Sequence, residues 1–180
     1  PKMGFALTWS TQVAQVKTLP AGHAIGYGNT YRTTAAETVV TLPVGYSNGL
    51  RRGPEHQGHV LLHGFKCPIR GRVSMEKLVV GVQHVVDAGV PVAVGDAVLL
   101  LGSQRAHAAA ATVDASGTVD GGDVRVEITP ADAARAIGTI DYEVLTGLMP
   151  ASPRWPPSVA QCAVDHYAWP AGFEQYEKEY

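Results

Sequence analysis

The chain lacks several features that mark common classes of protein. It has only two cysteines in 180 residues, Cys67 and Cys162, too few and too far apart for a disulfide framework or a cysteine-based metal cluster. Its formal net charge is −2, so it lacks the basic face of a general nucleic-acid binder, and we expect no nucleic-acid partner. No apolar run approaches the roughly 18 residues that a membrane-spanning helix needs, so we expect no membrane partner.

The first residues also lack the hydrophobic core of a secretory signal, because residues 1–5 read Pro-Lys-Met-Gly-Phe. We therefore expect a cytoplasmic location by default. The length is that of one ordinary domain, which is large enough to bury a hydrophobic core.

Short apolar or alternating segments separated by glycine and proline dominate the chain, and this pattern predicts strands. The segment 59–69 contains a predicted hairpin that turns near residues 64–66. Strands at this spacing favour a mainly β fold, either a compact barrel or a tightly wrapped sandwich. The expected strands are residues 6–17, 38–42, 59–64, 67–69, 73–82 and 97–101.

One short helix is predicted over residues 130–137. Thr129 is a suitable N-cap, Pro130 suits the first helical position, and Gly138 ends the pattern. The preceding residues 106–123 are rich in Ala, Gly and Asp and favour a longer hairpin or a loop.

Three motif runs carry the functional information. The first run, residues 24–33, places Tyr27 between two glycines, where the backbone can pass close to a ligand and the phenol stays uncovered. The second, residues 42–52, contains Gly45-Tyr46, and the third, residues 71–76, is Gly-Arg-Val-Ser-Met-Glu. From the residues alone, the first run indicates only an exposed tyrosine at the end of a strand.

In this order and at these separations, the three runs resemble the C-terminal domain of alanine racemase, a pyridoxal-phosphate (PLP) enzyme. The resemblance covers about residues 5 to 154, so we expect a racemase-like domain over 1–154 and a proline- and aromatic-rich tail over 155–180. It implies that PLP is bound by an N-terminal (β/α)₈ barrel that this chain does not include. It also implies that the barrel facing this domain belongs to the other subunit of a homodimer.

The resemblance implies that the enzyme interconverts L- and D-alanine and supplies D-alanine for peptidoglycan. Racemisation removes the α-proton from one face of the amino acid and returns a proton to the other face, with PLP as electron sink. One acid–base group is implied to be the barrel lysine, and the other is Tyr27. A phenol with an ordinary pKa near 10 needs a positive or hydrogen-bonding environment to act as a base at neutral pH.

Four further residues are implied to bind substrate. Met75 matches the methionine whose backbone N–H faces the substrate carboxylate, and Tyr46 matches a tyrosine that lines the substrate corridor. Glu76 stands where the family usually has aspartate, so its carboxylate is one methylene further out. Arg51, with Arg52, matches an arginine pair at the corridor or dimer interface, although a solvated turn explains the pair equally well.

A second departure from the family concerns the cofactor. Pro150 stands where the family usually has a tyrosine that contacts the PLP phosphate, and proline lacks a hydroxyl or N–H to donate. No cofactor-binding residue is therefore expected in this chain. Two alternatives stay open: a degenerate domain kept for protein association, and a racemase for serine or another amino acid.

Three histidines within eight residues, His56, His59 and His63, invite a metal interpretation. No aspartate, glutamate or cysteine nearby completes a recognisable ligand set, whereas catalytic zinc takes three well-placed protein ligands. Turn and surface histidines are the favoured interpretation, and no metal is expected.

Overall fold

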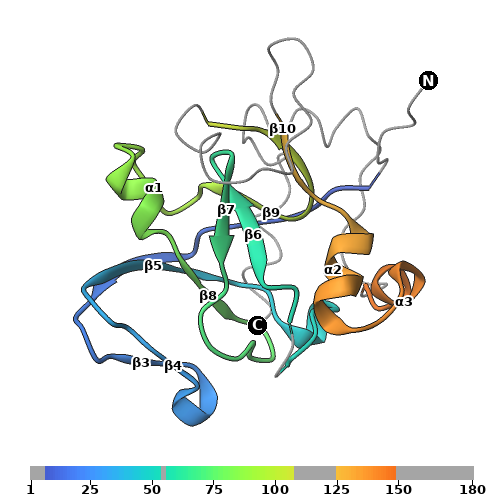
Figure 1. Ribbon diagram of the computed structural model, residues 1–180, viewed down its shortest axis with the longest axis horizontal. Coiled ribbons are helices and arrows are strands. Elements are labelled where there is room, and N and C mark those ends of the chain that lie inside the picture. Colours follow the sequence, from blue (N-terminus) through green and yellow to red (C-terminus); the bar gives the residue numbers. More distant parts are fainter. Residues whose placement is uncertain (1–6, 54–55, 108–124, 149–180) are drawn as a thin grey trace, which may run out of the picture.

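The structure is a computed structural model that describes residues 7–53, 56–107 and 125–148 (Figure 1). Its strands are β1 (Trp9–Gln12), β2 (Gln15–Leu19), β3 (Ala24–Ile25), β4 (Tyr31–Arg32), β5 (Glu37–Leu42), β6 (His59–Leu62), β7 (Phe65–Pro68), β8 (Leu78–Gly81), β9 (Ala97–Arg105) and β10 (Arg125–Ile128). Its helices are α1 (Gln83–Asp87), α2 (Pro130–Ile137) and α3 (Asp141–Thr146), with two 3₁₀ turns, η1 (Tyr27–Asn29) and η2 (Tyr46–Asn48).

The described strands form antiparallel sheets. A five-stranded sheet has the order β1-β9-β6-β7, with β10 also paired to β9, and a three-stranded sheet has the order β2-β5-β8. The short hairpin β3–β4 forms a sheet of its own. The mainly β prediction is confirmed, although the sheets do not close into a barrel.

The predicted strand over residues 6–17 is in fact two strands, because the chain changes sheets at Val13. Strand β1 pairs with β9, whereas β2 pairs with β5 in the other sheet. Between them, the Val13 N–H donates to the Asp96 carbonyl (2.9 Å) and the Ala14 N–H donates to the Thr41 carbonyl (2.9 Å). Each of these two residues thus satisfies its backbone in a different sheet, which breaks the strand pattern.

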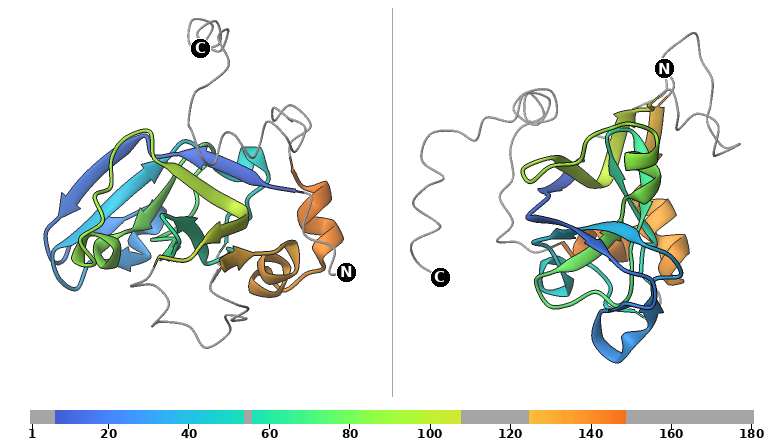
Figure 2. Two further views of the ribbon diagram at one scale, coloured as in Figure 1. Left: turned by 90° about the horizontal axis from the view of Figure 1, so that it is seen from above. Right: turned by 90° about the vertical axis from the view of Figure 1, so that its left-hand side faces the viewer.

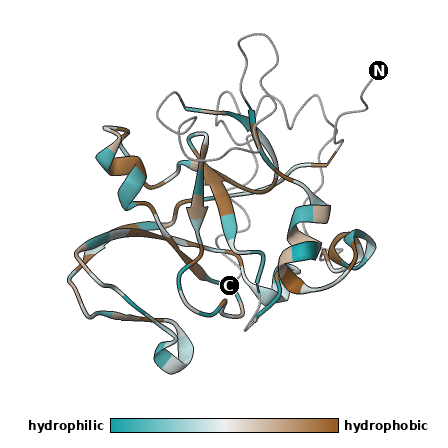
Figure 3. Ribbon diagram, viewed as in Figure 1, coloured by the Kyte–Doolittle hydropathy of each residue, from teal (hydrophilic) through white to brown (hydrophobic). Residues whose placement is uncertain are grey.

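Strands β6 and β9 are buried on both faces. The residues on one face, such as Val60 and Leu100, join a core shared with β5, β7 and β8. The alternate residues, such as Leu61 and Leu99, join a second cluster with Ile128 from β10 and with α2. Successive side chains of a strand point to opposite faces, so an uninterrupted apolar run fills two cores at once. These central strands are brown in Figure 3, whereas the η1 turn is pale to teal.

The hairpin β6–β7 turns one residue earlier than predicted. Its two turn residues, His63 and Gly64, both have positive φ angles (50° and 78°), which is the requirement of a type I′ turn. The predicted strand over 73–82 shortens to β8, since the residues before it form a loop.

The prediction of a single helix is wrong, because the described residues contain three. Helix α2 has its predicted bounds, and the Thr129 side chain accepts a hydrogen bond from the Asp132 N–H (3.1 Å) as N-cap. Helix α1 directly follows a buried strand, so its apolar residues continue the strand pattern and hide its start. Helix α3 packs with α2 at one end of the domain, away from the β3–β4 hairpin (Figure 2).

Candidate active site

Tyr27 lies at the tip of the β3–β4 hairpin, as the first residue of η1. Gly26 before it has a φ angle of 75°, a conformation that residues with a Cβ rarely adopt, so this turn requires glycine. The Tyr27 side chain is 64% exposed. Its hydroxyl makes no hydrogen bond to another described residue, so the phenol is available to a ligand.

Tyr46 begins the second 3₁₀ turn, η2, which backbone hydrogen bonds fix. The Tyr46 N–H donates to the Ser74 carbonyl (3.0 Å), and the Ser47 N–H donates to the Met75 carbonyl (2.9 Å). A Cβ on Gly45 would lie 2.2 Å from the Ser74 carbonyl oxygen, so only glycine permits this approach. The Tyr46 side chain is 37% exposed.

Residues 71–75, which we name the bridging segment, lie against both turns. A Cβ on Gly71 would lie 2.6 Å from the Ile25 carbonyl oxygen, and a Cβ on Gly26 would lie 3.0 Å from the Arg72 nitrogen. Backbone therefore meets backbone just before Tyr27, while the far end of the segment hydrogen-bonds to η2. The structure thus brings together the three runs that the sequence singled out.

Met75, the last residue of the bridging segment, and Glu76 form the exposed tip of a loop. The Ser74 N–H donates to the Lys77 carbonyl (2.9 Å), which turns the chain between them. Met75 is 55% exposed, and its N–H donates no hydrogen bond within the part of the chain that the structure describes. That N–H is therefore free to bind an anionic group such as a carboxylate.

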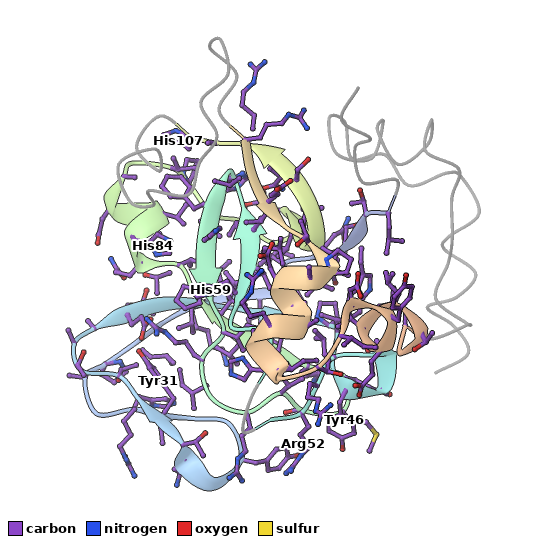
Figure 4. The ribbon with its side chains drawn as sticks, turned by 45° about the vertical axis from the view of Figure 1, so that its right-hand side comes forward. Tyr31, Tyr46, Arg52, His59, His84 and His107 are labelled. Atoms are coloured by element: carbon purple, nitrogen blue, oxygen red, sulfur yellow. The ribbon has the colours of Figure 1, made fainter. Side chains whose placement is uncertain are left out.

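Arg51 lies against α3. Its guanidinium forms an ion pair with Glu143 (3.2 Å), and both side chains are about half exposed. Figure 4 shows Tyr46 and Arg52 at the lower edge of the domain in that view and Tyr31 at its left, on the hairpin side. Pro150 lies outside the described residues.

Sequence reasoning missed a partly buried network at the base of the Tyr27 hairpin. The Tyr31 hydroxyl donates to Glu37 Oε2 (2.6 Å), and Arg70 Nε donates to Glu37 Oε1 (2.8 Å). The Arg70 guanidinium also lies over the Tyr31 ring, 4.6 Å from its centroid. Only one signal pointed to this network: a single acidic residue at the start of the apolar strand β5.

A hollow of about 270 Å³ adjoins the network and the bridging segment. His56 lines it and accepts a hydrogen bond at Nδ1 from the Gly58 N–H (3.1 Å). Burial and the nearby charge of His59 lower the pKa of His56, while a hydrogen bond with the Gly71 backbone acts in the opposite direction. The lining residues are Thr30, Tyr31, His56, Ile69, Gly71 and Arg72.

The comparisons with known proteins agree with one another. The family described as alanine racemase, C-terminal domain, matches residues 6–121, which is more than half of the chain. The chain belongs to the alanine racemase C-terminal domain family. An alanine racemase from Symbiobacterium thermophilum is 39% identical over 154 residues, covering 86% of this chain and 35% of that protein. One from Streptococcus thermophilus is 41% identical over 150 residues, covering 83% and 34%.

Solved structures of alanine racemases show the same fold. The one from E. faecalis superposes with a TM-score of 0.60 at 33% identity, covering 79% of this chain and 31% of that one. The one from the D-cycloserine producer Streptomyces lavendulae has a TM-score of 0.62 at 30% identity, covering 82% and 32%. The chain thus spans about a third of the length of the relatives it matches.

No lysine lines the hollow of about 270 Å³ beside the bridging segment. What the domain offers is an exposed phenol and a free N–H, groups suited to the substrate side of a site. No group of three or more possible metal ligands was found among the described residues.

The buried thiol of Cys67 lies near the imidazole of the more exposed His84. Cys67 Sγ lies 3.8 Å from His84 Nε2. Burial raises the pKa of Cys67 to about 12 and lowers the pKa of His84, so both groups are neutral at pH 7. A neutral thiol is a poor nucleophile, and the pair serves packing.

None of the helices in the described ranges is long and apolar enough to cross a membrane.

Proposed function

We propose that the chain is the C-terminal domain of a PLP-dependent alanine racemase and that Tyr27 is the acid–base group on one face of the substrate. One observation carries the proposal: Tyr27 is exposed on a turn that requires glycine, and its hydroxyl makes no hydrogen bond to another described residue. Through the bridging segment, the same turn is joined to the free N–H of Met75. A proton carrier and a carboxylate binder on one connected surface suit an amino-acid substrate.

The chemistry assigns a task to each residue of this chain. Bound PLP supplies the electron sink that tolerates loss of the α-proton. Tyr27 Oη accepts that proton from, or donates one to, a single face of the α-carbon, and the barrel lysine serves the other face. The Met75 N–H holds the carboxylate, while Tyr46, Glu76 and Arg51 line the approach. General acid–base groups of this kind contribute about 10²–10⁴-fold to the rate.

The proposal includes a partner. Because Tyr27 and Met75 face solvent in this domain, another surface is needed to enclose the substrate, and we assign this role to the PLP-binding barrel of the second subunit of a homodimer. Interconversion of L- and D-alanine in the cytoplasm would supply D-alanine for peptidoglycan. The chain alone is expected to be inactive, because the proposal places the PLP lysine on the barrel.

The test is an assay of alanine racemisation by the domain assembled with its barrel, in both directions. Borohydride reduction followed by mass spectrometry should place the trapped PLP on a lysine outside this chain. An assembly that binds PLP yet racemises no amino acid would support the alternative of an association domain.

A second substrate is favoured by one residue. Glu76 projects from the exposed tip beside Met75 and carries a longer side chain than the usual aspartate. A single change in a pocket alters discrimination by roughly 1–3 kcal/mol, which is enough to change the preferred amino acid. The test compares kcat/KM for alanine and for serine in the wild-type assembly and in the Glu76→Asp variant. The substrate with the higher kcat/KM in the wild type is the preferred amino acid.

A further inference from the structure

The Tyr31–Glu37–Arg70 network joins three elements that are far apart in the sequence. Tyr31 comes from β4, Glu37 begins β5, and Arg70 follows β7. Each carboxylate oxygen of Glu37 has its own donor: the Tyr31 hydroxyl at 2.6 Å and Arg70 Nε at 2.8 Å. The network is therefore a fixed point between the hairpin and the body of the domain.

Because Glu37 is buried, its carboxylate must be paired. Glu37 is only 8% exposed, and a buried carboxylate is tolerated when it is paired and fully hydrogen-bonded. Gly81 leaves the space it needs, since a Cβ there would lie 2.5 Å from Glu37 Oε1. Burial and the hydrogen bond to Glu37 raise the pKa of Tyr31, which keeps its hydroxyl protonated as a donor.

The network holds the hairpin at the end nearest Tyr27. Tyr31 pairs directly with Ile25 across the hairpin, and η1 spans the residues between them. On the other side, Arg70 leads into Gly71, which lies against the Ile25 carbonyl. The η1 turn itself is closed by a single described backbone hydrogen bond, from the Asn29 N–H to the Gly26 carbonyl (3.3 Å). Its position therefore depends on what holds Ile25 and Tyr31.

We propose that Tyr31, Glu37 and Arg70 are positioning residues that set where the Tyr27 hydroxyl stands relative to the substrate α-carbon. This inference rests on the proposed function of Tyr27. The three side chains do not touch substrate. They hold both strands of the hairpin and the start of the bridging segment in one register, so that the phenol and the Met75 N–H keep a constant separation.

The first test measures position without catalysis. Tyr31→Phe removes one hydroxyl and leaves the Glu37–Arg70 pair in place. In the 180-residue chain, amide hydrogen–deuterium exchange of peptides covering residues 24–32 should become several-fold faster, while peptides covering β6 and β9 stay unchanged. Tyr142→Phe is the matched control, because it makes the same chemical change at a largely exposed tyrosine of α3 and should alter neither set.

The second test measures the catalytic consequence in the racemase assembled with its barrel. A misplacement of about 1 Å can cost about 10²-fold in rate, so Tyr31→Phe should lower kcat about 10- to 100-fold with little change in KM. The loss should differ between the two enantiomers. Exchange of the α-hydrogen with solvent deuterium should slow for the enantiomer deprotonated by Tyr27 and stay near wild type for the other.

Glu37→Gln provides a second variant, because it keeps an acceptor for Tyr31 but loses the charge that pairs with Arg70. Faster amide exchange at 24–32 together with the lopsided kinetic loss, in either variant, supports the inference. Unchanged amide exchange, or equal slowing for both enantiomers, overturns it. Full activity of Tyr27→Phe would instead overturn the proposed function and leave the amide-exchange result as a purely structural finding.

Discussion

The two tyrosine-bearing turns, η1 and η2, look alike in sequence and are held in different ways. Each follows a glycine, begins with tyrosine and lies against the bridging segment. Main-chain hydrogen bonds to Ser74 and Met75 fix η2, with help from its own Ser47 and Asn48 side chains. In contrast, η1 depends on the more distant side chains of Tyr31, Glu37 and Arg70. Tyr27 is also far more exposed than Tyr46.

The difference teaches that similar local patterns can have different sensitivities to mutation. A turn held by backbone keeps its place when nearby side chains change, whereas a turn held by a remote ion pair moves when that pair is altered. We therefore expect η2 to keep its position in such variants, and we expect the position of η1, which bears Tyr27, to respond to them.

The largest expected effect separates the two phenols chemically. In the assembled racemase, Tyr27→Phe should lower racemisation about 10²–10⁴-fold in both directions, because the acid–base hydroxyl is lost. The free energy of unfolding should change by less than about 0.5 kcal/mol, since the hydroxyl is exposed and unbonded. Tyr46→Phe is the matched control and should act mainly on KM. Equal losses of kcat in the two variants would show that the two phenols do not differ in catalytic role.

The next effect separates the two glycines. Gly45→Ala should destabilise the chain by about 3 kcal/mol, at or above the upper end of the overpacking range, because its Cβ meets two backbone carbonyls. Gly26→Ala should cost less, about 1–2 kcal/mol, mostly from its positive φ angle. Urea unfolding of both variants checks the order. A larger loss for Gly26→Ala would show that η1, not η2, is the rigid turn.

A third prediction uses pH. The pKa of His56 is lowered in the folded chain, so the unfolded chain takes up its proton first as pH falls below about 6.5. Stability from this group is therefore present above that pH and is lost as pH falls through the folded pKa. Urea unfolding at pH 7 and pH 5 should show a smaller difference in His56→Gln than in wild type. His84, whose pKa is also lowered, remains in both and sets the residual difference.

The same protonation should act unequally on the two turns. His56 contacts Gly71, which adjoins the η1 side of the bridging segment. Amide exchange at pH 5 should therefore increase around residues 24–30 more than around 45–49. The opposite order would place the weak point at η2.

The smallest effect concerns Arg51. Its ion pair with Glu143 joins two half-exposed side chains, and such pairs contribute about 0–1 kcal/mol. Arg51→Ala should change stability by less than about 0.5 kcal/mol if main-chain contacts and the turn's own Ser47 and Asn48 side chains hold η2. A loss above about 1 kcal/mol, measured by thermal or urea unfolding, would show that η2 also relies on the ion pair with α3.

Local patterns predicted much of this molecule, and long-range pairings account for the rest. Two of the three runs place a tyrosine directly after a glycine, so both turns are visible in adjacent residues. Helix α2 is equally visible from Thr129 and Pro130 at its start. The Glu37–Arg70 pair spans 33 positions and leaves no periodic trace. The sheet change at Val13 was hidden because alternation continues through it while its hydrogen-bond partners change.

That change of sheets at Val13 also has a consequence for folding. One uninterrupted stretch of chain supplies an edge strand to each of the two sheets, with Val13 itself buried in the shared core. If β1 detaches from one sheet, it pulls on β2 in the other sheet, because the two strands are continuous. Local opening of one sheet is therefore tied to opening of both. The domain should therefore lose its two sheets in a single cooperative step, with amides of β5 and β9 exchanging with the same free energy of opening.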